Sequence, residues 1–426
     1  MVIKSNQLLK KLINGGFIHI VTSGAISRIL LFAGSFLIVR ILSIEENGVF
    51  QTANNIVSMF MLISGLGTLS AVFQFACESH ENQLKRRSYF RYGFNHGVLF
   101  NLLLASFLML YSFFVPIEIE GVSGVLLAMS TLPITNYIAE AIPIFLRSEF
   151  DNKGFSFFNA LSSVFRVISL IVLAWLYNIW GAVLSMHLAN VFSLILIIII
   201  KREFFTIFKQ KILLGKGEKK AFWKISIVSM LNNSISHLLY NIDVFMMSIM
   251  IPLASIVATY KTATLIPFAL NFIPLTIVIF VWPYFAKHIN DKLWLRTYYI
   301  MLVKYFGVFN FLVSLTFIFF ANEIVVLIFG SDYEESVLPF RILMVGYFFA
   351  STFRIVSGNI LVALRKVTFN LIVSSISGLL NILLNFILIH RFGMIGAAFS
   401  TLAIMILSSI ASTIYLWHIL WFSNSD

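Results

Sequence analysis

Charged residues are scarce in this sequence: Asp, Glu, Lys and Arg make up 11% of its 426 residues, whereas hydrophobic residues make up 59%. No polar stretch is long enough to form a separate soluble domain, the longest being the link over residues 201–220. This composition excludes an ordinary soluble globular protein. It is typical of a multi-pass membrane protein whose functional sites lie among its helices.

Cysteine is nearly absent, since Cys77 is the only one. A single cysteine excludes an internal disulfide and any cysteine-based zinc or iron–sulfur centre. Acidic residues are also few, 18 Asp and Glu against 30 Lys and Arg. The basic excess is scattered over short loops instead of forming one patch, so we expect no nucleic-acid partner, and we expect no cofactor.

Long apolar stretches recur along the whole chain. They predict an all-α integral membrane protein with twelve transmembrane helices, most of them long enough to cross about 30 Å of hydrocarbon. The first stretch reaches Ile38 and lacks a cleavage signature, which favours a spanning helix over a signal peptide. The predicted spans are 17–39, 48–76, 89–115, 121–146, 154–177, 179–200, 222–250, 254–282, 298–320, 335–364, 367–390 and 393–421.

The Lys and Arg residues of the loops predict the orientation of these helices. Alternate loops and the N-terminal tail hold 22 of them, the other loops hold only Arg40 and Arg391, and six inside the spans complete the 30. Because positively charged loops stay in the cytoplasm, both termini are expected to be cytoplasmic. The link from Phe204 to Leu214 mixes apolar and basic residues and is expected to lie as a surface helix in the cytoplasmic membrane interface.

Two short motifs recur at nearly the same offset. Gly48-Val-Phe-Gln-Thr-Ala-Asn54 resembles Ala258-Thr-Tyr-Lys-Thr-Ala-Thr264, and Trp180-Gly-Ala-Val-Leu-Ser185 resembles Ile395-Gly-Ala-Ala-Phe-Ser400. We therefore predict an internal repeat, with one six-helix bundle over residues 1–220, a second over residues 221–426, and a central cavity. Transporters built from such repeats bind substrate between the halves and rock one half against the other.

Six cationic residues lie inside the predicted spans, namely Arg28, Arg166, Lys261, Lys304, Arg341 and Arg354. A charge at the bilayer centre costs roughly 3 kcal/mol, so six would cost about 18 kcal/mol. Folded proteins are stable by only about 5–15 kcal/mol. The acids inside the spans, Glu140 and Asp243, are too few to neutralise the cations, so we expect most cations to face a water-filled cavity that accepts an anion.

The position of each cation within its span divides the set. Arg28, Arg166 and Arg354 lie near span centres, so we predict that they bind substrate. Lys304 and Arg341 lie near span ends, where a long side chain can reach the headgroups, and we expect them to anchor helix ends. Thirteen residues separate Arg341 from Arg354, which corresponds to about 220° of helical rotation. These two arginines should therefore point in different directions.

Three further ionisable residues have open roles. Lys261 is expected either to bind substrate or to form a structural ion pair with Asp243, which lies at a similar depth in the preceding span. Asp243 and Glu140 are candidates for ion coupling, because ionisable residues inside a membrane mark ion and substrate pathways. Glu140 follows Asn136 by one helical turn.

Polar residues recur at helical spacing in several spans, which places them on one face of each helix. Asn159 and Ser163 share a face with Arg166, and Asn381 and Asn385 share a face of a later span. Such stripes can be hydrogen bonds between helices or contacts to sugar hydroxyls. Beside a midmembrane arginine we favour the second alternative, so we predict that all four residues bind substrate.

Segments 45–50, 240–248, 257–263, 329–333 and 393–398 resemble the polysaccharide-transport (Wzx-type) flippases. The resemblance extends over nearly the whole chain and is most specific between Asp243 and Ala263. These flippases form one superfamily with the multidrug and toxin extrusion exporters and the lipid II flippases. The resemblance implies two six-helix bundles and a cationic cavity, which agrees with the midmembrane arginines.

The resemblance also implies a substrate. It would be an undecaprenyl-diphosphate-linked oligosaccharide, the repeat unit of O-antigen, capsule or a similar surface polysaccharide, moved from the cytoplasmic to the outer face of the bacterial inner membrane. The expected partners are this glycan lipid, membrane lipids, and the machinery that polymerises the glycan and sets its chain length. The arginines would bind its phosphates through charge-assisted hydrogen bonds.

Two other functions stay open. A multidrug or organic cation exporter of the same superfamily needs acids in its site, whereas here six basic residues and two acids lie inside the spans. A membrane-embedded polysaccharide-modifying enzyme needs a catalytic cluster near one face, and the sequence contains no clustered acids or suitably spaced histidines. We therefore expect a transporter and not an enzyme.

Overall fold

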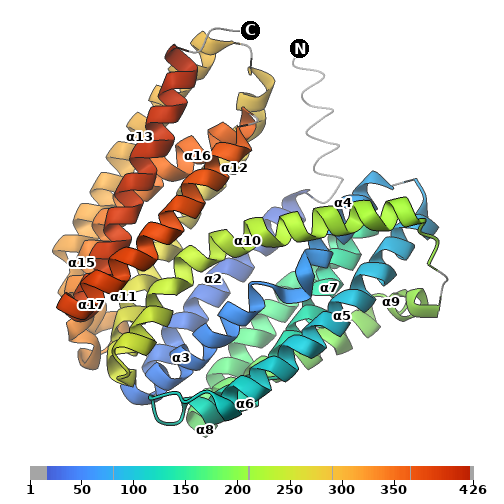
Figure 1. Cartoon of the computed structure of the whole chain (residues 1–426), viewed down its shortest axis with the longest axis horizontal. Helices are drawn as coiled ribbons and strands as arrows, with labels where there is room; N and C mark the ends of the chain where they lie inside the picture. The colour runs from blue at the N-terminus through green and yellow to red at the C-terminus, as the bar shows by residue number, and fades with distance from the viewer. Residues whose placement is uncertain (1–16, 80, 210–211, 290, 365, 423–426) are drawn as a thin grey trace. The chain divides into compact units, whose positions relative to one another are not determined.

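The computed structural model describes residues 17–79, 81–209, 212–289, 291–364 and 366–422, and over these ranges it consists of helices, turns and loops without a strand. It divides into two compact units, the first ending at Ser234 and the second beginning at Ile235. This boundary falls inside one helix, α10 (Lys216–Met250). The all-α fold class is confirmed for the described ranges (Figure 1).

Unit 1, residues up to Ser234, contains ten helical elements and the first part of α10. They are α2 (Phe17–Ile41), α3 (Ile44–Met61), η1 (Ser64–Gly67), α4 (Thr68–Glu78), α5 (Gln83–Phe114), α6 (Val122–Met129), α7 (Leu132–Ser148), α8 (Asn152–Ile200), α9 (Glu203–Thr206) and η2 (Ile207–Lys209).

Unit 2, residues from Ile235, contains the rest of α10 and nine further elements. They are α11 (Ala254–Leu270), α12 (Phe272–Lys287), α13 (Lys292–Phe319), α14 (Ala321–Phe329), η3 (Ser331–Ser336), α15 (Val337–Phe349), η4 (Ala350–Arg354), α16 (Ile355–Ala363) and α17 (Val367–Trp421).

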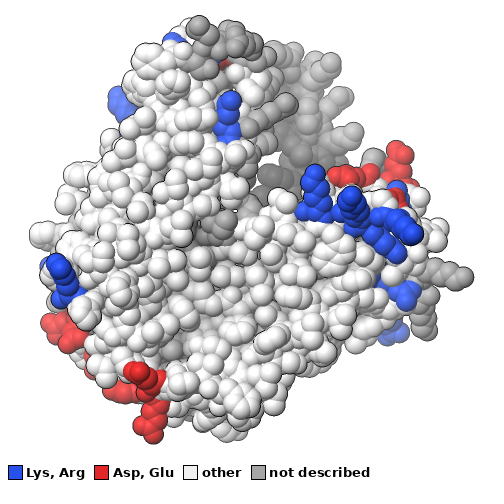
Figure 2. Space-filling model, in the orientation of Figure 1, with Lys and Arg blue, Asp and Glu red and all other residues white. Residues whose placement is uncertain are grey.

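The helices have the length and the exposed apolar surface of membrane spans. Within the described ranges, seven helices are long and apolar enough to cross a membrane, or eight if α6 and α7, bent by 42°, count as one span. Only 17% of the most apolar stretch of α13 is buried. On the face shown in Figure 2, broad areas of the surface carry no Lys, Arg, Asp or Glu. A soluble protein does not leave such surfaces in water, so this is a multi-pass membrane protein.

Two very long helices, α8 and α17, are each interrupted at one point. α8 leaves helical geometry at Tyr177 and Asn178 (φ 50°, ψ −133°), and α17 does so at Gly393 (φ 58°, ψ −137°). A straight helix of the length of α8 would extend about 74 Å, more than twice the roughly 30 Å of hydrocarbon. The breaks lie at the boundaries predicted between spans 154–177 and 179–200 and between spans 367–390 and 393–421.

A glycine after each break lets the chain fold back closely on itself. A Cβ added to Gly181 would lie 1.8 Å from the carbonyl oxygen of Leu173, and one added to Gly396 would lie 2.0 Å from that of Leu388. Both contacts are with the residue eight positions earlier. Any side chain would collide there with backbone, so these glycines allow a tight helical hairpin.

The repeat predicted from sequence motifs is also present in the backbone. α8 and α17 begin 215 residues apart, at 152 and 367, and break 215 residues apart, at 178 and 393. The helices that carry the first motif, α3 and α11, begin 210 residues apart, at 44 and 254. These two pairs of helices therefore recur at the offsets of the sequence motifs, and the division at 220/221 stays a prediction.

The first part of α10 packs into unit 1 beside a broken helix. Between α3 and α4, Gly65, Leu66 and Gly67 all have positive φ, which leaves backbone carbonyls without helical partners. The Ser226 hydroxyl donates to the Leu66 carbonyl (2.6 Å), and Ser234 donates to that of Leu62 (2.5 Å). These bonds explain why the unit boundary falls within α10 and not in the preceding link.

One end of unit 1 gathers the charged ends of several segments. Arg87 at the start of α5 contacts Glu149 after α7 (3.3 Å) and Glu203 in α9 (2.7 Å), and Lys85 contacts Glu218 in α10 (2.6 Å). In Figure 2, basic atoms gather over the region where Figure 1 labels α4 and α9. Loops that the charge count assigned to one side therefore meet at one end.

The polar link before α10 is packed more deeply into unit 1 than we expected. Phe204, Ile207 and Leu214 are 1%, 0% and 8% exposed and belong to an apolar core that includes Phe90 and Phe145. The prediction of a solvated surface helix over Phe204–Leu214 is wrong for these three side chains. Their apolar surface is buried against the unit's own aromatic residues, which removes it from water.

Candidate functional site

The first candidate site lies where α2 and α8 pack together in unit 1. The Ser27 hydroxyl donates to the Asn159 carbonyl (3.2 Å), and a Cβ added to Gly34 would lie 3.4 Å from Val167. The second contact lies seven residues after the first along α2 and eight residues after it along α8. Both helices therefore advance in the same direction and run parallel. This agrees with the predicted spans, because successive crossings alternate in direction and the first and fifth spans, 17–39 and 154–177, should therefore be parallel.

Two predicted substrate residues, Arg28 and Arg166, lie on these parallel helices. Arg28 follows Ser27, and Arg166 lies seven residues after Asn159 on the same face of α8. The register places the two arginines about 9 Å apart along the helix axes. Both are exposed, although both lie well inside their helices. Unit 1 therefore presents two neighbouring cations at the depth of a membrane interior.

Glu140 of α7 lies close enough to Arg166 for an electrostatic interaction. It is also exposed, and the described residues contain no ion pair between the two groups. Its neighbour one turn earlier, Asn136, accepts a hydrogen bond from Asn190 (2.7 Å). The carboxylate of Glu140 is thus near the guanidinium of Arg166 without a direct contact.

The polar stripe beside Arg166 is partly satisfied within its own helix. Ser163 donates to the Asn159 carbonyl (2.8 Å), and Ser169 donates to the Arg166 carbonyl (3.1 Å). Such backbone bonds use the hydroxyl proton, so Ser163 can offer only its lone pairs to a ligand. The half-buried side chain of Asn159 is the better placed polar group.

The second candidate site surrounds a buried carboxylate in unit 2. Asp243 of α10 is 2% exposed. Its Oδ1 accepts from Asn385 (2.6 Å), and its Oδ2 accepts from Tyr260 (3.2 Å) and from Thr401. Asn385 also donates to Asn381 Oδ1 (3.2 Å). The structure thus brings together three predicted residues, Asp243, Asn381 and Asn385.

Lys261 does not neutralise this carboxylate. It is half-buried and directly follows Tyr260, but no ion pair joins it to Asp243 in the described part of the chain. The two groups therefore interact only at longer range, without a direct ion pair. A buried carboxylate held only by neutral donors carries a large desolvation cost, which a proton or a bound cation would relieve.

Two side chains that donate hydrogen bonds to Asp243 were not predicted from the sequence. They are Tyr260 and Thr401. A signal was present for Thr401, because Asn385 and Thr401 each lie eight residues from the break at Gly393. In a tight antiparallel hairpin, residues at equal distances from the turn lie side by side. Tyr260 has no comparable signal, since its alternative as an apolar packing residue fits the sequence equally well.

Arg354 lies at the end of the π-helical turn η4. A π turn holds one residue more than an α turn, so the rotation from Arg341 to Arg354 is about 120° instead of the expected 220°. The two arginines still point in different directions. Arg341 Nε donates to the Ile318 carbonyl (3.2 Å) at the end of α13, which agrees with an anchoring role, and Lys304 is exposed.

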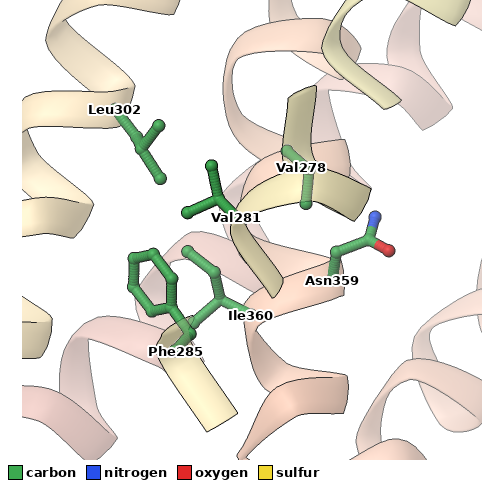
Figure 3. Close-up of a pocket in the computed structure, with 6 residues that line it drawn as sticks. All are labelled: Val278, Val281, Phe285, Leu302, Asn359 and Ile360. Carbon is green, nitrogen blue, oxygen red and sulfur yellow. The ribbon is translucent and has the colours of Figure 1, made fainter. Parts of the chain in front are cut away.

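A narrow apolar crevice in unit 2 is not part of either site. It is lined by Val278, Val281, Phe285, Leu302, Asn359 and Ile360 (Figure 3). Its one polar lining group, Asn359, donates to its own helix at the Ile355 carbonyl (2.8 Å). The crevice therefore offers no polar contact for a charged headgroup.

Comparison with known proteins gives a family and a fold. A family model described as "Polysaccharide biosynthesis protein" matches residues 13–289. No curated protein matches the sequence. Among solved structures, an inward-facing multidrug resistance transporter of the MATE family and the MOP superfamily is similar, with a TM-score of 0.76 and 13% identity over 92% of this chain and 94% of that one.

Two other solved structures share the fold. The lipid II flippase MurJ, in an inward closed conformation, matches with a TM-score of 0.69 and 16% identity over 96% of this chain and 94% of its own. A MOP superfamily transporter from Pyrococcus furiosus matches with a TM-score of 0.62 and 14% identity over 96% of each chain. At these identities the likeness establishes the fold alone.

Proposed function

Because this chain belongs to the polysaccharide biosynthesis protein family, we propose that it is a flippase for undecaprenyl-diphosphate-linked oligosaccharide repeat units. It moves the headgroup from the cytoplasmic to the outer face of a bacterial inner membrane by alternating access. The repeat unit belongs to O-antigen, capsule or a similar surface polysaccharide. Other proteins that polymerise the glycan and set its length would receive the product.

The observation that carries the proposal is the pair of exposed arginines on α2 and α8. Arg28 and Arg166 lie on neighbouring parallel helices, and Glu140 lies near Arg166. A guanidinium forms paired, charge-assisted hydrogen bonds to phosphate oxygens, which compensates the phosphate for its lost hydration. We propose that these arginines, with Arg354 of unit 2, bind the diphosphate, and that Lys261, Asn159, Ser163, Asn381 and Asn385 contact the headgroup.

We further propose that the chain crosses the membrane twelve times. α8 and α17 each count as two crossings because of their breaks, which turns eight apolar helices into ten, and α2 and α10 complete the twelve. An even number places both termini on one side, and the basic loops assign that side to the cytoplasm. The central cavity between two six-helix bundles stays a prediction.

The membrane potential supplies a driving force for such a substrate. The potential is negative inside, so a headgroup with two negative charges releases free energy when it moves outward. At a potential of about 100 mV this is about 4.6 kcal/mol, at roughly 2.3 kcal/mol per charge. The empty site is cationic, so the same field favours its return to the cytoplasmic side. The charges of the protein cross the field in both directions and cancel over a cycle, so the net electrical work comes from the headgroup alone, and transport needs no ATP.

We propose that Asp243 adds ion coupling to this cycle. The carboxylate oxygens of Asp243 lie in a small group of side-chain oxygens that also includes those of Asn381, Asn385, Tyr260 and Thr401. Such oxygens suit a proton or a hard monovalent cation such as Na⁺. Glu140 is the second candidate, because it is exposed and interacts with Arg166.

The alternative function is export of organic cations, which the likeness in fold to a multidrug transporter permits. Such a site needs an accessible acid, whereas Asp243 is 2% exposed and holds three hydrogen bonds. Glu140 is accessible, but it faces a cation of its own unit. An enzyme that modifies polysaccharide is a weaker alternative, since no group of three or more His, Cys, Asp or Glu side chains in the described ranges could hold a metal.

Deletion of the gene tests the proposed function. We expect surface glycan to disappear and the undecaprenyl-linked repeat unit to accumulate on the cytoplasmic side, measured by lipid extraction and mass spectrometry. The matched measurement is resistance to cationic drugs, which should not change. Normal surface glycan without accumulation, or a loss of drug resistance alone, would contradict the proposal and favour the exporter.

A further inference from the structure

The helix that carries Arg354 contains a π turn, Ala350–Arg354, between α15 and α16. The N–H of Ile355 bonds to the carbonyl of Ala350, five residues earlier. One extra residue in a turn rotates everything after it by about 100° relative to a straight α-helix. No other π turn occurs in the described ranges. The direction in which Arg354 leaves its helix therefore depends on this one turn.

A buried asparagine on a neighbouring helix matches the π turn. Asn310 of α13 accepts a hydrogen bond from the Tyr347 hydroxyl (2.9 Å) and donates one to Thr352 Oγ1 (3.2 Å), and all three side chains are fully buried. In an α-helix, two residues five positions apart face about 140° away from each other. The first part of the π turn lies between these two positions and reduces this angle. The amide of Asn310 bridges Tyr347 and Thr352 across this part of the turn and so stabilises the π geometry.

Two more hydrogen bonds hold the same turn from other sides. The Ser351 hydroxyl donates to Asn271 Oδ1 (2.8 Å), at the junction of α11 and α12, and the Ser409 hydroxyl of α17 donates to the Phe349 carbonyl (3.1 Å). π turns interrupt α-helices mostly at functional sites. Three neighbouring elements thus stabilise an irregular turn that ends at a midmembrane arginine.

We propose that Asn310 and Thr352 are positioning residues for the anion site. They stabilise the π turn and thereby fix the direction of the Arg354 side chain, without contacting substrate themselves. The relevance of this direction to transport rests on the proposed function, which makes Arg354 a phosphate ligand. The geometric part of the proposal does not depend on that function.

Cysteine labelling tests the geometry directly. Because Cys77 is the only cysteine, Cys77→Ser gives a cysteine-free protein, in which Arg354→Cys provides one thiol for a water-soluble maleimide. We expect Thr352→Val and Asn310→Leu to lower the labelling rate at position 354. Thr352→Ser keeps the hydroxyl and should preserve the rate. The control is Ser314→Ala, which removes a buried hydrogen bond from α13 to the Met344 carbonyl (2.6 Å) before the π turn and should also preserve the rate.

A transport assay with Arg354 present accompanies the labelling. Complementation of the deletion should be lost with Thr352→Val and retained with Thr352→Ser. If Asn310→Leu does not insert, the nearly isosteric Thr352→Val still decides the outcome. An unchanged labelling rate with Thr352→Val overturns the positioning role, whatever happens to transport. A lowered rate together with full transport by Arg354→Ala supports the positioning role and contradicts the assignment of Arg354 to substrate, so the two failures are distinguishable.

Discussion

The two repeats share a backbone but not a chemistry. α8 and α17 begin 215 residues apart and break 215 residues apart, so Arg166 of unit 1 corresponds to Asn381 of unit 2. Asn381 takes part in the hydrogen-bond network of a buried carboxylate, whereas Arg166 is exposed near Glu140. The same place in the fold thus holds a cation in one half and a neutral amide in the other.

The donors that hold Asp243 extend this comparison, because each has an apolar counterpart in unit 1. The counterparts of Asn385 and Thr401 are Leu170 and Met186, 215 residues earlier, and that of Tyr260 is Phe50, 210 residues earlier. Helical hairpins of this kind depend on glycine contacts and apolar packing. Interior positions away from those contacts can therefore differ between halves, so that one half suits an anion and the other a cation.

The largest expected effect is the loss of transport on removal of a midmembrane arginine. Arg166→Ala and Arg28→Ala in unit 1, and Arg354→Ala in unit 2, should each abolish complementation of a deletion strain, because a desolvated phosphate would lose its charge-assisted hydrogen bonds. Membrane insertion, measured by immunoblot of the membrane fraction, should be normal. Lys304→Ala, near a span end, is the matched control and should complement fully. Equal tolerance of all four variants would refute the assignment.

The next largest effect concerns the ends of the two units that are predicted to face the cytoplasm. In unit 1, Arg87 pairs with Glu149, whose side chain is 5% exposed, whereas in unit 2 Arg296 donates to the Leu420 carbonyl (2.7 Å) and lies over Trp421. Removal of one member of a buried ion pair costs about 3–5 kcal/mol. Loss of one hydrogen bond and one cation–π contact costs about 1–2 kcal/mol. Thermal unfolding in detergent should therefore show Arg87→Ala to be less stable than Arg296→Ala, and the reverse order would disprove the difference between the ends.

The hairpin glycines should be equivalent in the two halves. Gly181→Ala and Gly396→Ala each force a Cβ onto a backbone carbonyl oxygen, at 1.8 and 2.0 Å, and overpacking of this kind costs about 1–3 kcal/mol. The unfolding temperature should fall by similar amounts for both. Gly24→Ala, where nothing lies within 4 Å, is the control and should have no such effect. A loss of stability in one half only would show that the two hairpins are not equivalent.

The smallest effect involves the half-buried carboxylate of Glu218, before the apolar part of α10. The hydrogen bond from Lys85, followed by one from the Gly215 amide, lowers the pKa of Glu218. A carboxylate with a lowered pKa in the folded state stabilises above its ordinary pKa, and this contribution is lost as the pH falls through the lowered value. Glu218→Gln should therefore be slightly less stable than the parent at pH 7 and equal to it well below about pH 4. An identical difference at both pH values would show that the charge plays no part.

Much of the fold could be predicted from the sequence because its causes are local. The apolar stretches, the basic loops and the Gly-Ala motifs gave the all-helical membrane fold, and the predicted boundaries at 177/179 and 390/393 agree with the breaks in α8 and α17. The packing of Phe204 into unit 1 could not be predicted. It depends on contacts with residues more than 100 positions earlier, which a local pattern does not contain.

The sites were less predictable, for a similar reason. Counting residues at 100° per position correctly placed Asn159 and Arg166 on one face of α8, but it failed across the π turn before Arg354, where one residue is added. The direct ion pair that was one of two alternatives for Lys261 is not found, because Tyr260 and Thr401, from two different helices, hold the carboxylate of Asp243 instead. Depth in the membrane can be estimated from sequence, whereas the partner at that depth is set by tertiary packing.

The most direct test of the account exchanges the residues that distinguish the halves. Binding of undecaprenyl diphosphate should be measured in lipid nanodiscs for the parent protein, for Arg166→Asn, which gives unit 1 the residue found at the equivalent place in unit 2, and for Lys304→Ala. We expect the Kd to rise about tenfold or more for Arg166→Asn, as for the loss of one hydrogen bond to a charged group, and to stay unchanged for Lys304→Ala. Equal affinity of the parent and Arg166→Asn would contradict the claim that unit 1 binds the anionic headgroup.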